Sequence, residues 1–251
     1  FIDCWRTFYT RLPGGEYRTL PGLVVVWADS VLPFCNAVLL SHPVQDVADL
    51  QARIETMRVF LAGKDKPPMF LVCQDWLPLS IRPIADALIA QAGLAPAIPL
   101  TGMVADLVLP PVKPLPPLDF RRVDDESSRK LISDINSIAY GFALEYGREA
   151  FTQPEAWQGH CYGYVGYAAE TPVCAATTML LDNSLYVGFV ATLPDFHRRG
   201  YAEAVMRHSL NDAMHQTKVN RTVLHATDEG HGIYRRMGFR DVARFMGYVC
   251  P

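Results

Sequence analysis

The sequence lacks several features that would each point to a familiar class of protein. No apolar run approaches the roughly 18 residues that a membrane-spanning helix requires, so we expect no membrane protein. None of the six cysteines forms a Cys-x-x-Cys pair, which removes the usual spacing of a zinc site. Lys and Arg total 23 against 26 Asp and Glu, a formal net charge of −3. A nucleic-acid-binding protein, which usually carries a basic excess, is therefore not expected.

Two common phosphate-binding motifs are missing as well. There is no Gly-x-x-x-x-Gly-Lys-(Ser/Thr) loop and no Gly-x-Gly-x-x-Gly after a predicted strand. This argues against a nucleotide-phosphate enzyme of another α/β class. The few scattered cysteines favour free, mostly buried thiols in a reducing compartment, with a few disulfides in a secreted protein as the alternative. With no recognisable signal peptide, we expect a cytoplasmic protein that holds no metal ion.

A proline-rich segment divides the chain. Residues 109–118 read Leu-Pro-Pro-Val-Lys-Pro-Leu-Pro-Pro-Leu, and five prolines in ten residues fit neither a helix nor a central strand. At 251 residues the chain is long enough for two ordinary domains. We therefore predict an accessory α/β domain over 1–110, a linker over 111–118 and a second domain over 119–251.

Hydrophobic periodicity predicts an α/β (α+β) protein with a mixed, mostly antiparallel sheet flanked by helices. In the second half we expect strands at 120–123, 161–168, 173–181, 184–192, 222–227 and 245–250, and helices at 124–140, 143–150, 201–216 and 229–236. In the first half we expect strands at 24–27, 37–40, 69–74 and 102–109, and helices at 47–61 and 81–91. Both halves end in the order helix, glycine, strand, which hints at two similar domains.

The strongest chemical signal is the segment from Thr192 to Glu203, Thr-Leu-Pro-Asp-Phe-His-Arg-Arg-Gly-Tyr-Ala-Glu. A β-rich run ends there and a helix begins at once, and the N–H groups and dipole of a helix start favour an anion such as phosphate. Gly200 lets the backbone approach that anion because it has no Cβ. Arg198 and Arg199 add the charge that a pyrophosphate needs. The alternative is a solvated turn with two exposed arginines.

This strand–loop–helix resembles the acyl-CoA signature (Arg/Gln)-x-x-Gly-x-(Gly/Ala) of the GNAT superfamily of acyl-CoA-dependent N-acyltransferases. The signature falls on residues 197–202, with His197 where the family usually has Arg or Gln. Residues 233–239, Ile-Tyr-Arg-Arg-Met-Gly-Phe, are similar to the family's Tyr-x-x-x-Gly-Phe. The order of expected elements over 118–251 also resembles the family, and the first half looks like the degenerate, cofactor-free first domain of tandem GNAT proteins.

The resemblance implies an N-acetyltransferase that moves an acetyl group from acetyl-CoA to a primary amine of a small molecule, amino acid or peptide. It implies that Tyr234 protonates the leaving thiolate and that an N–H near Val190 binds the acyl carbonyl. The implied cofactor-binding residues are Val190, Ala191 and Thr192 for the pantetheine arm, and His197, Arg198, Arg199, Gly200, Tyr201 and Ala202 for the pyrophosphate. The alternative is a non-catalytic GNAT-fold sensor of acyl-CoA or a metabolite. Either protein would be a monomer or a homodimer.

The sequence leaves the general base open. His225, Glu145 and His160 are candidates, and a water relay is an alternative. A lone histidine on a predicted strand is more often packed than catalytic. Glu145, Tyr146 and Glu149 fall in a segment expected to shape the acceptor pocket, where they suit either a cationic amine or a solvated helix face.

Overall fold

A computed structural model describes residues 1–251, and the chain forms two compact units. The C-terminal unit contains Met103–Asp241 together with Phe1 and Asp3. The N-terminal unit contains Cys4–Gly102 and Val242–Pro251, together with Ile2. The last strand of the chain therefore belongs to the N-terminal unit rather than to the half of the sequence that carries it.

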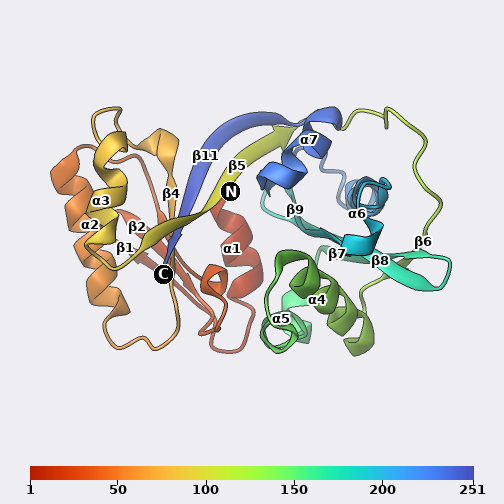
Figure 1. The fold of residues 1–251 in the computed structure, drawn as a ribbon, viewed down its shortest axis with the longest axis horizontal. Helices are drawn as coiled ribbons and strands as arrows, with labels where there is room; N and C mark the ends of the chain where they lie inside the picture. The colour runs from red at the N-terminus through yellow and green to blue at the C-terminus, as the bar shows by residue number, and fades with distance from the viewer. The chain divides into compact units, whose positions relative to one another are not determined.

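The C-terminal unit is a sheet between two layers of helices. Helices α6 and α7 cover one face of this sheet, and α4 and α5 cover the other (Figure 1). The strands lie in the order β10-β9-β8-β7-β6, and all neighbours are antiparallel except the parallel pair β9 and β10. The elements are β6 (Asp119–Arg122), α4 (Glu126–Tyr140), α5 (Leu144–Phe151), β7 (Cys161–Ala168), β8 (Thr171–Leu180), β9 (Leu185–Thr192), α6 (Tyr201–Thr217), β10 (Thr222–Ala226) and α7 (Asp228–Arg236), with short 3-10 helices at η4 (Pro154–Trp157) and η5 (Pro194–Phe196).

Helix α6 is fixed to this sheet by one apolar face. Val205, Met206 and Leu210 of α6 are fully buried in one cluster with Val173 and Cys174 of β8. Burying side chains of this size stabilises the fold by about 1.5–3 kcal/mol each. The start of α6, where the phosphate-binding turn was predicted, is thereby held at one end of a rigid layer.

Both ends of helix α4 are set by capping residues in its own sequence. The Asp125 carboxylate accepts the Ser128 N–H at 2.7 Å, and the Ser128 hydroxyl accepts the Asp125 N–H at 3.1 Å, which makes a capping box. The helix ends at Gly141, whose φ of 74° is left-handed and carries no Cβ penalty in glycine. These ends fix the length of α4, whose last turns reach β9.

The N-terminal unit is also a sheet with helices against it, α2 and α3 lying together on one side (Figure 1). Here β3 and β4 are parallel, and β11 runs antiparallel to β4 from Phe245 opposite Cys73 to Val249 opposite Met69. The elements are α1 (Ile2–Tyr9), β1 (Glu16–Leu20), β2 (Leu23–Trp27), η1 (Pro33–Cys35), β3 (Asn36–Leu40), α2 (Val47–Leu61), β4 (Met69–Cys73), η2 (Gln74–Trp76), η3 (Arg82–Ile84), α3 (Ala85–Ala90), β5 (Ala95–Ala105) and β11 (Arg240–Val249).

The two units repeat one order of elements. In the N-terminal unit the antiparallel pair β2–β3 leads through α2 to β4, which is parallel to β3. In the C-terminal unit the antiparallel pair β8–β9 leads through α6 to β10, which is parallel to β9. A helix and a strand follow in both cases. The expected fold class, a mixed and mostly antiparallel sheet flanked by helices in two similar domains, is confirmed.

Several expected boundaries were wrong. The strand expected at 102–109 spans Ala95–Ala105. Its first part contains Pro96 and Pro99, which are unusual inside a strand, and its start was therefore placed too late. The final strand begins at Arg240 instead of residue 245, and the sequence reasoning missed α1 and β1. None of the helices combines the length and the hydropathy that crossing a bilayer demands.

Deleting Val242–Pro251 should unfold the N-terminal unit and leave the C-terminal unit folded. Strand β4 would lose its β11 partner, and the hydrogen bond from the fully buried Tyr248 to Asp86, at 2.7 Å, would disappear. Hydrogen exchange should show β4 amides losing protection while β8 amides keep theirs. Removing only Cys250 and Pro251, which lie outside β11, is the control. Full protection of β4 in the longer deletion would contradict this account.

Candidate functional site

Strands β9 and β10 separate soon after they meet. Their parallel pairing covers three residue pairs, from Leu185 opposite Thr222 to Val187 opposite Leu224, while β9 stays paired with β8 as far as Thr192. The N–H of the next residue, Leu193, bonds to a β8 carbonyl at 2.9 Å. Since backbone groups alternate between the two edges of a strand, those of Thr192 face the other edge. We call the part of β9 beyond Val187 on that side the open edge.

A bulge interrupts β9 on the open edge. The register between β8 and β9 shifts between Ala175 and Thr177, because β9 carries one extra residue there. Phe189 has φ 53°, a left-handed conformation that costs a non-glycine residue about 1 kcal/mol or more. Its ring is held by aromatic packing, with ring centroids 4.9 Å from Phe151 and 5.9 Å from Trp157. The packing keeps the peptide groups of the bulge in a fixed orientation.

Helix α4 donates hydrogen bonds to two successive carbonyls of this bulge. The Tyr140 hydroxyl donates to the Val190 carbonyl at 2.9 Å. One turn earlier, the Asn136 amide donates to the Phe189 carbonyl at 3.4 Å and to the Ile132 carbonyl at 2.9 Å. The sequence reasoning missed both residues. The available signal was a polar side chain, Asn136, on the apolar stripe of α4.

The end of the turn between β9 and α6 presents N–H groups that the main chain does not use. Arg198 and Gly200 are left-handed, with φ 61° and 82°. Left-handed residues in a turn help to form anion-binding concavities, and we call the segment from Arg198 to Gly200 the nest. The first main-chain bond of α6 runs from the Ala204 N–H to the Gly200 carbonyl. The N–H groups of Tyr201 to Glu203 therefore have no acceptor within the helix. A nest followed by a helix start suits a phosphate group.

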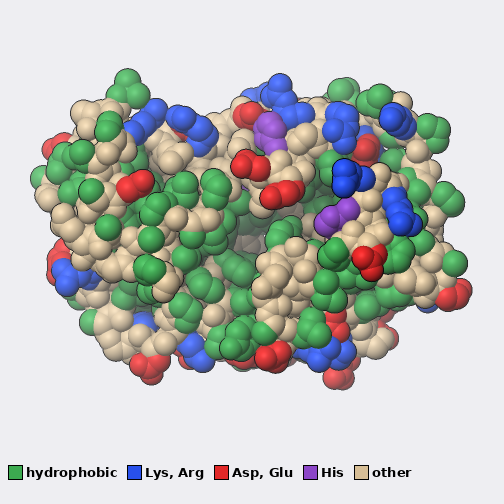
Figure 2. All heavy atoms as spheres, in the orientation of Figure 1, with side chains coloured by type: hydrophobic (Ala, Val, Ile, Leu, Met, Phe, Trp, Pro, Cys, Tyr) green, Lys and Arg blue, Asp and Glu red, His purple; other side chains and the backbone are tan.

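The ring of His197, and not its main-chain N–H, is the group of this residue that reaches the open edge. Its N–H bonds to the Pro194 carbonyl at 3.2 Å, whereas ring Nε2 lies 2.8 Å from the Thr192 carbonyl on the open edge. Arg199 donates to the main-chain oxygen of Asp195 at 3.0 Å. Figure 2 shows basic side chains and histidines over the region of α6 and α7, with acidic side chains among them.

Tyr234 of α7 lies in the core that joins α7 to the sheet, with 8% of its surface exposed. Its ring rests on the first turn of α7, because a Cβ added at Gly230 would be 2.8 Å from ring Cε2 and 3.2 Å from the hydroxyl oxygen. Burial, and after it the neighbouring Tyr140, raises the pKa of Tyr234 well above its usual range. The phenol therefore stays protonated at neutral pH and is a hydrogen donor.

The three candidate bases lie on separate elements. His225 of β10 has ring Nδ1 3.2 Å from the Tyr186 hydroxyl, and burial lowers its pKa to about 3, so it is a weak base. His160 precedes β7, two strands from β9, with Nδ1 3.1 Å from the Tyr162 hydroxyl. Glu145 is exposed on α5. The structure does not gather these three residues into one site.

The corresponding helix start in the N-terminal unit is already occupied by carboxylates. The Asp46 side chain caps α2 by accepting the Asp49 N–H at 2.8 Å, and the nearly buried Arg53 side chain pairs with Asp49 at 2.7 Å. The Val44 N–H bonds to the Trp76 carbonyl at 2.9 Å, which links the segments following β3 and β4. An anion would meet negative charge at this helix start, unlike at the start of α6.

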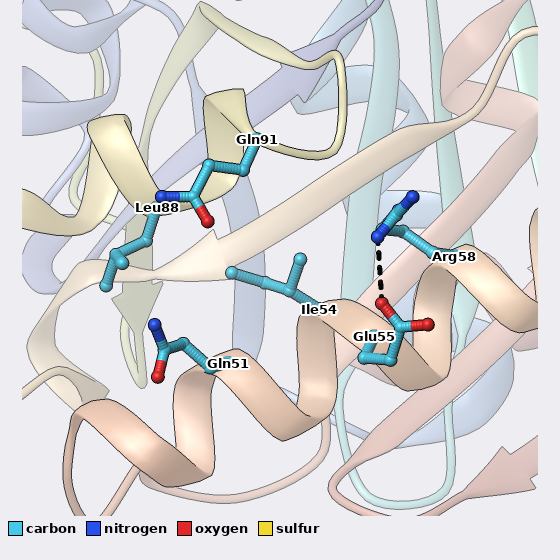
Figure 3. Close-up of a pocket in the computed structure, with 6 residues that line it drawn as sticks. All are labelled: Gln51, Ile54, Glu55, Arg58, Leu88 and Gln91. Carbon is cyan, nitrogen blue, oxygen red and sulfur yellow. Dashed lines mark hydrogen bonds and ion pairs between the residues drawn. The ribbon is translucent and has the colours of Figure 1, made fainter.

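Two surface hollows lie away from the open edge. One, of about 180 Å³, separates α2 from α3, and the Glu55–Arg58 ion pair on its wall is satisfied at 2.9 Å (Figure 3). The other, of about 470 Å³, lies between α6 and the segment that follows β5. Neither is lined by a residue of β9.

The open edge, the bulge, the nest and the buried tyrosine all belong to the C-terminal unit, on β9, the turn before α6, and α7. Residues 157–241 match the family model described as "Acetyltransferase (GNAT) domain". The resemblance inferred from the two motifs is confirmed. No curated protein matches the sequence significantly.

Solved structures extend the likeness to nearly the whole chain. A GCN5-related N-acetyltransferase from Kribbella flavida has a TM-score of 0.72 at 17% identity, covering 99% of this chain and 93% of that one. A functionally unknown conserved protein from Staphylococcus epidermidis has a TM-score of 0.65 at 12% identity, covering 94% of each chain. A tandem GNAT protein from the clavulanic acid biosynthesis pathway has a TM-score of 0.55 at 13% identity, covering 90% and 77%. These similarities concern the fold.

Two glycines of α7 should respond in opposite ways to alanine. Alanine normally stabilises a helix interior by about 0.5–1 kcal/mol relative to glycine. We expect this gain for Gly232→Ala, since the nearest atom to the new Cβ is 3.6 Å away. Gly230→Ala should instead lower the free energy of unfolding, because its Cβ would displace the buried Tyr234 ring. Denaturant unfolding of both variants checks this, and equal stabilisation would show that the ring is free to move.

Proposed function

We propose that the C-terminal unit moves an acetyl group from acetyl-CoA to a primary amine of a small molecule, amino acid or peptide. The observation that carries the proposal is the order of two features along one stretch of chain. The open edge of β9 reaches Thr192, and the nest at Arg198 and Gly200 follows within one short turn. An acyl-CoA has the matching order of groups, a thioester arm with two amides followed by a pyrophosphate.

The residues present fit such a donor. The Thr192 N–H and the second lone pair of the Val190 carbonyl would pair with the amides of the arm as an added strand does, and Ala191 lies between them. The N–H groups of the turn, from Arg198 to Ala202, would hold the pyrophosphate, aided by the two arginines and with the His197 ring beside Thr192. No cluster of three or more potential metal ligands is present. The chemistry we propose relies on these organic groups alone.

In the transfer we propose, the neutral amine forms a bond to the thioester carbon, the C–S bond breaks, and the Tyr234 hydroxyl gives its proton to the leaving sulfur. The extra proton on the amine nitrogen leaves through a water relay, and the Tyr234 phenolate regains a proton from water. The raised pKa of Tyr234 keeps the donor form present over the whole pH range in which an amine becomes neutral. It also makes the phenol a weak acid, so proton transfer accompanies C–S cleavage.

The principal alternative is a sensor that binds acyl-CoA or a metabolite without turnover. What favours it is that the three candidate bases, His225, His160 and Glu145, lie in separate parts of the fold. A water relay removes the difficulty for the enzyme.

We further propose that the N-terminal domain, residues 1–110, is an accessory domain that binds no cofactor, since Asp46 and Asp49 occupy the start of α2. The proline-rich segment at 111–118 would join it to an acetyltransferase domain at 119–251, whose last residues, Val242–Pro251, belong to the N-terminal unit of the fold. A cytoplasmic location and a monomeric or homodimeric state complete the proposal.

Tyr234→Phe should bind acetyl-CoA with unchanged affinity and lose about 10²–10⁴-fold in kcat, because only the proton donor is removed. The measurement is release of the CoA thiol with a panel of primary amines, amino acids and peptides, alongside calorimetric binding. In the wild type, kcat/KM should show no loss of the acid up to about pH 10. A wild type that binds acetyl-CoA yet acetylates no member of the panel would favour the sensor.

Gly200→Glu should abolish acetyl-CoA binding, since it places a carboxylate in the nest. Its Cβ would also lie 3.2 Å from Pro116 Cδ. Gly93→Glu is the matched control, because Gly93 is likewise left-handed, with φ 77°, and has no neighbour near the added Cβ. Calorimetry should find control affinity close to the wild type. Intact binding by Gly200→Glu would refute the assignment of the turn.

A further inference from the structure

Asn136 and Tyr140 stand one turn apart on α4 and donate to adjacent carbonyls of the β9 bulge. Their acceptors are the Phe189 carbonyl at 3.4 Å and the Val190 carbonyl at 2.9 Å. Residues four apart lie on the same face of a helix, so one helix face holds two consecutive peptide groups of the strand. The bulge needs such support because the left-handed Phe189 is strained, with φ 53°.

The geometry of a peptide group carries this restraint to a neighbouring donor. The Phe189 carbonyl and the Val190 N–H belong to one planar trans peptide, so they point in opposite directions. A hydrogen bond from Asn136 that draws this carbonyl toward α4 therefore turns the Val190 N–H away from α4. The Tyr140 bond fixes the following peptide in the same way. The direction of the Val190 N–H is thus set from outside the strand.

We propose that Asn136, assisted by Tyr140, is a positioning residue that aims the Val190 N–H at the carbonyl oxygen of the bound thioester. This inference rests on the proposed function. When the amine bonds to the thioester carbon, the carbonyl electron pair moves to the oxygen, and the Val190 N–H stabilises that charge. The pair then returns to re-form the carbonyl as the C–S bond breaks and the sulfur takes the Tyr234 proton.

A merely structural role for Asn136 makes a different prediction. Asn136 is 3% exposed and lies among the buried residues of α4 that include Ile132 and Ile135. Its bond to the Ile132 carbonyl lies within the helix and would satisfy the amide without β9. If Asn136 only fills space, replacing it with leucine should not change the ratio of the affinities for an acyl-CoA that has the thioester carbonyl and for an analogue that has a methylene in its place.

The test compares two ligands of the full chain, acetyl-CoA and S-ethyl-CoA, a thioether in which a methylene replaces the carbonyl. One hydrogen bond to that carbonyl should make wild-type affinity for acetyl-CoA about tenfold higher. Asn136→Leu should lose this preference while its Kd for S-ethyl-CoA stays unchanged. Tyr140→Phe should lose part of it and serves as the second variant if Asn136→Leu does not fold. Asn211→Leu, on α6 away from β9, should keep the full preference.

A second readout is the carbonyl stretch of ¹³C-labelled acetyl-CoA, measured by infrared difference spectroscopy. The band should shift to lower frequency on binding to the wild type and shift less with Asn136→Leu. An unchanged affinity ratio, or equal weakening of both ligands in the two variants, would overturn the positioning role. If the wild type binds neither ligand, the proposed function fails and this inference fails with it.

Discussion

The candidate site depends on a parallel strand pair that stops pairing early. Because β9 and β10 share three residue pairs and then part, β9 leaves N–H and C=O groups without a strand partner on the side from which β10 diverges. Such groups are costly to leave unpaired in a folded protein. The structure meets that cost in part with its own side chains, Tyr140 on the Val190 carbonyl and His197 on the Thr192 carbonyl. The roles we propose for the turn before α6 and for the buried tyrosine depend on a ligand bound along this edge.

The same architecture occurs twice with different chemistry at the helix start. In the N-terminal unit the parallel strands β3 and β4 are likewise joined through a helix that begins in a short loop, but Asp46 caps that helix and Arg53 pairs with Asp49. In the C-terminal unit the equivalent turn has Arg198, Arg199 and Gly200 and no side-chain cap. A few residues at the helix N-terminus thus decide whether its N–H groups are capped by the protein's own side chains or remain available to an anion.

Local sequence predicted what local physics controls. The runs of alternating apolar and polar residues predicted most of the strands. The Gly200 turn was recognisable because glycine is the residue most often found where the backbone is left-handed. The bulge was not recognisable, since Leu185–Thr192 reads as an uninterrupted strand and Phe189 carries no mark of its positive φ. The roles of Asn136 and Tyr140 depend on contacts some 50 residues away along the chain. Such contacts arise from tertiary packing, which a single sequence does not display.

The place of β11 has a consequence for the order in which the protein is made. Strand β4 pairs with β11, although the two strands are far apart in the sequence: β4 ends at Cys73 and β11 ends at Val249. During synthesis β4 remains without this neighbour until the whole C-terminal unit has been translated. Pairing over such a separation is slow. The half that is translated first is therefore the half that finishes folding last, and in the nascent chain the apolar β4 lacks one flank for most of that time.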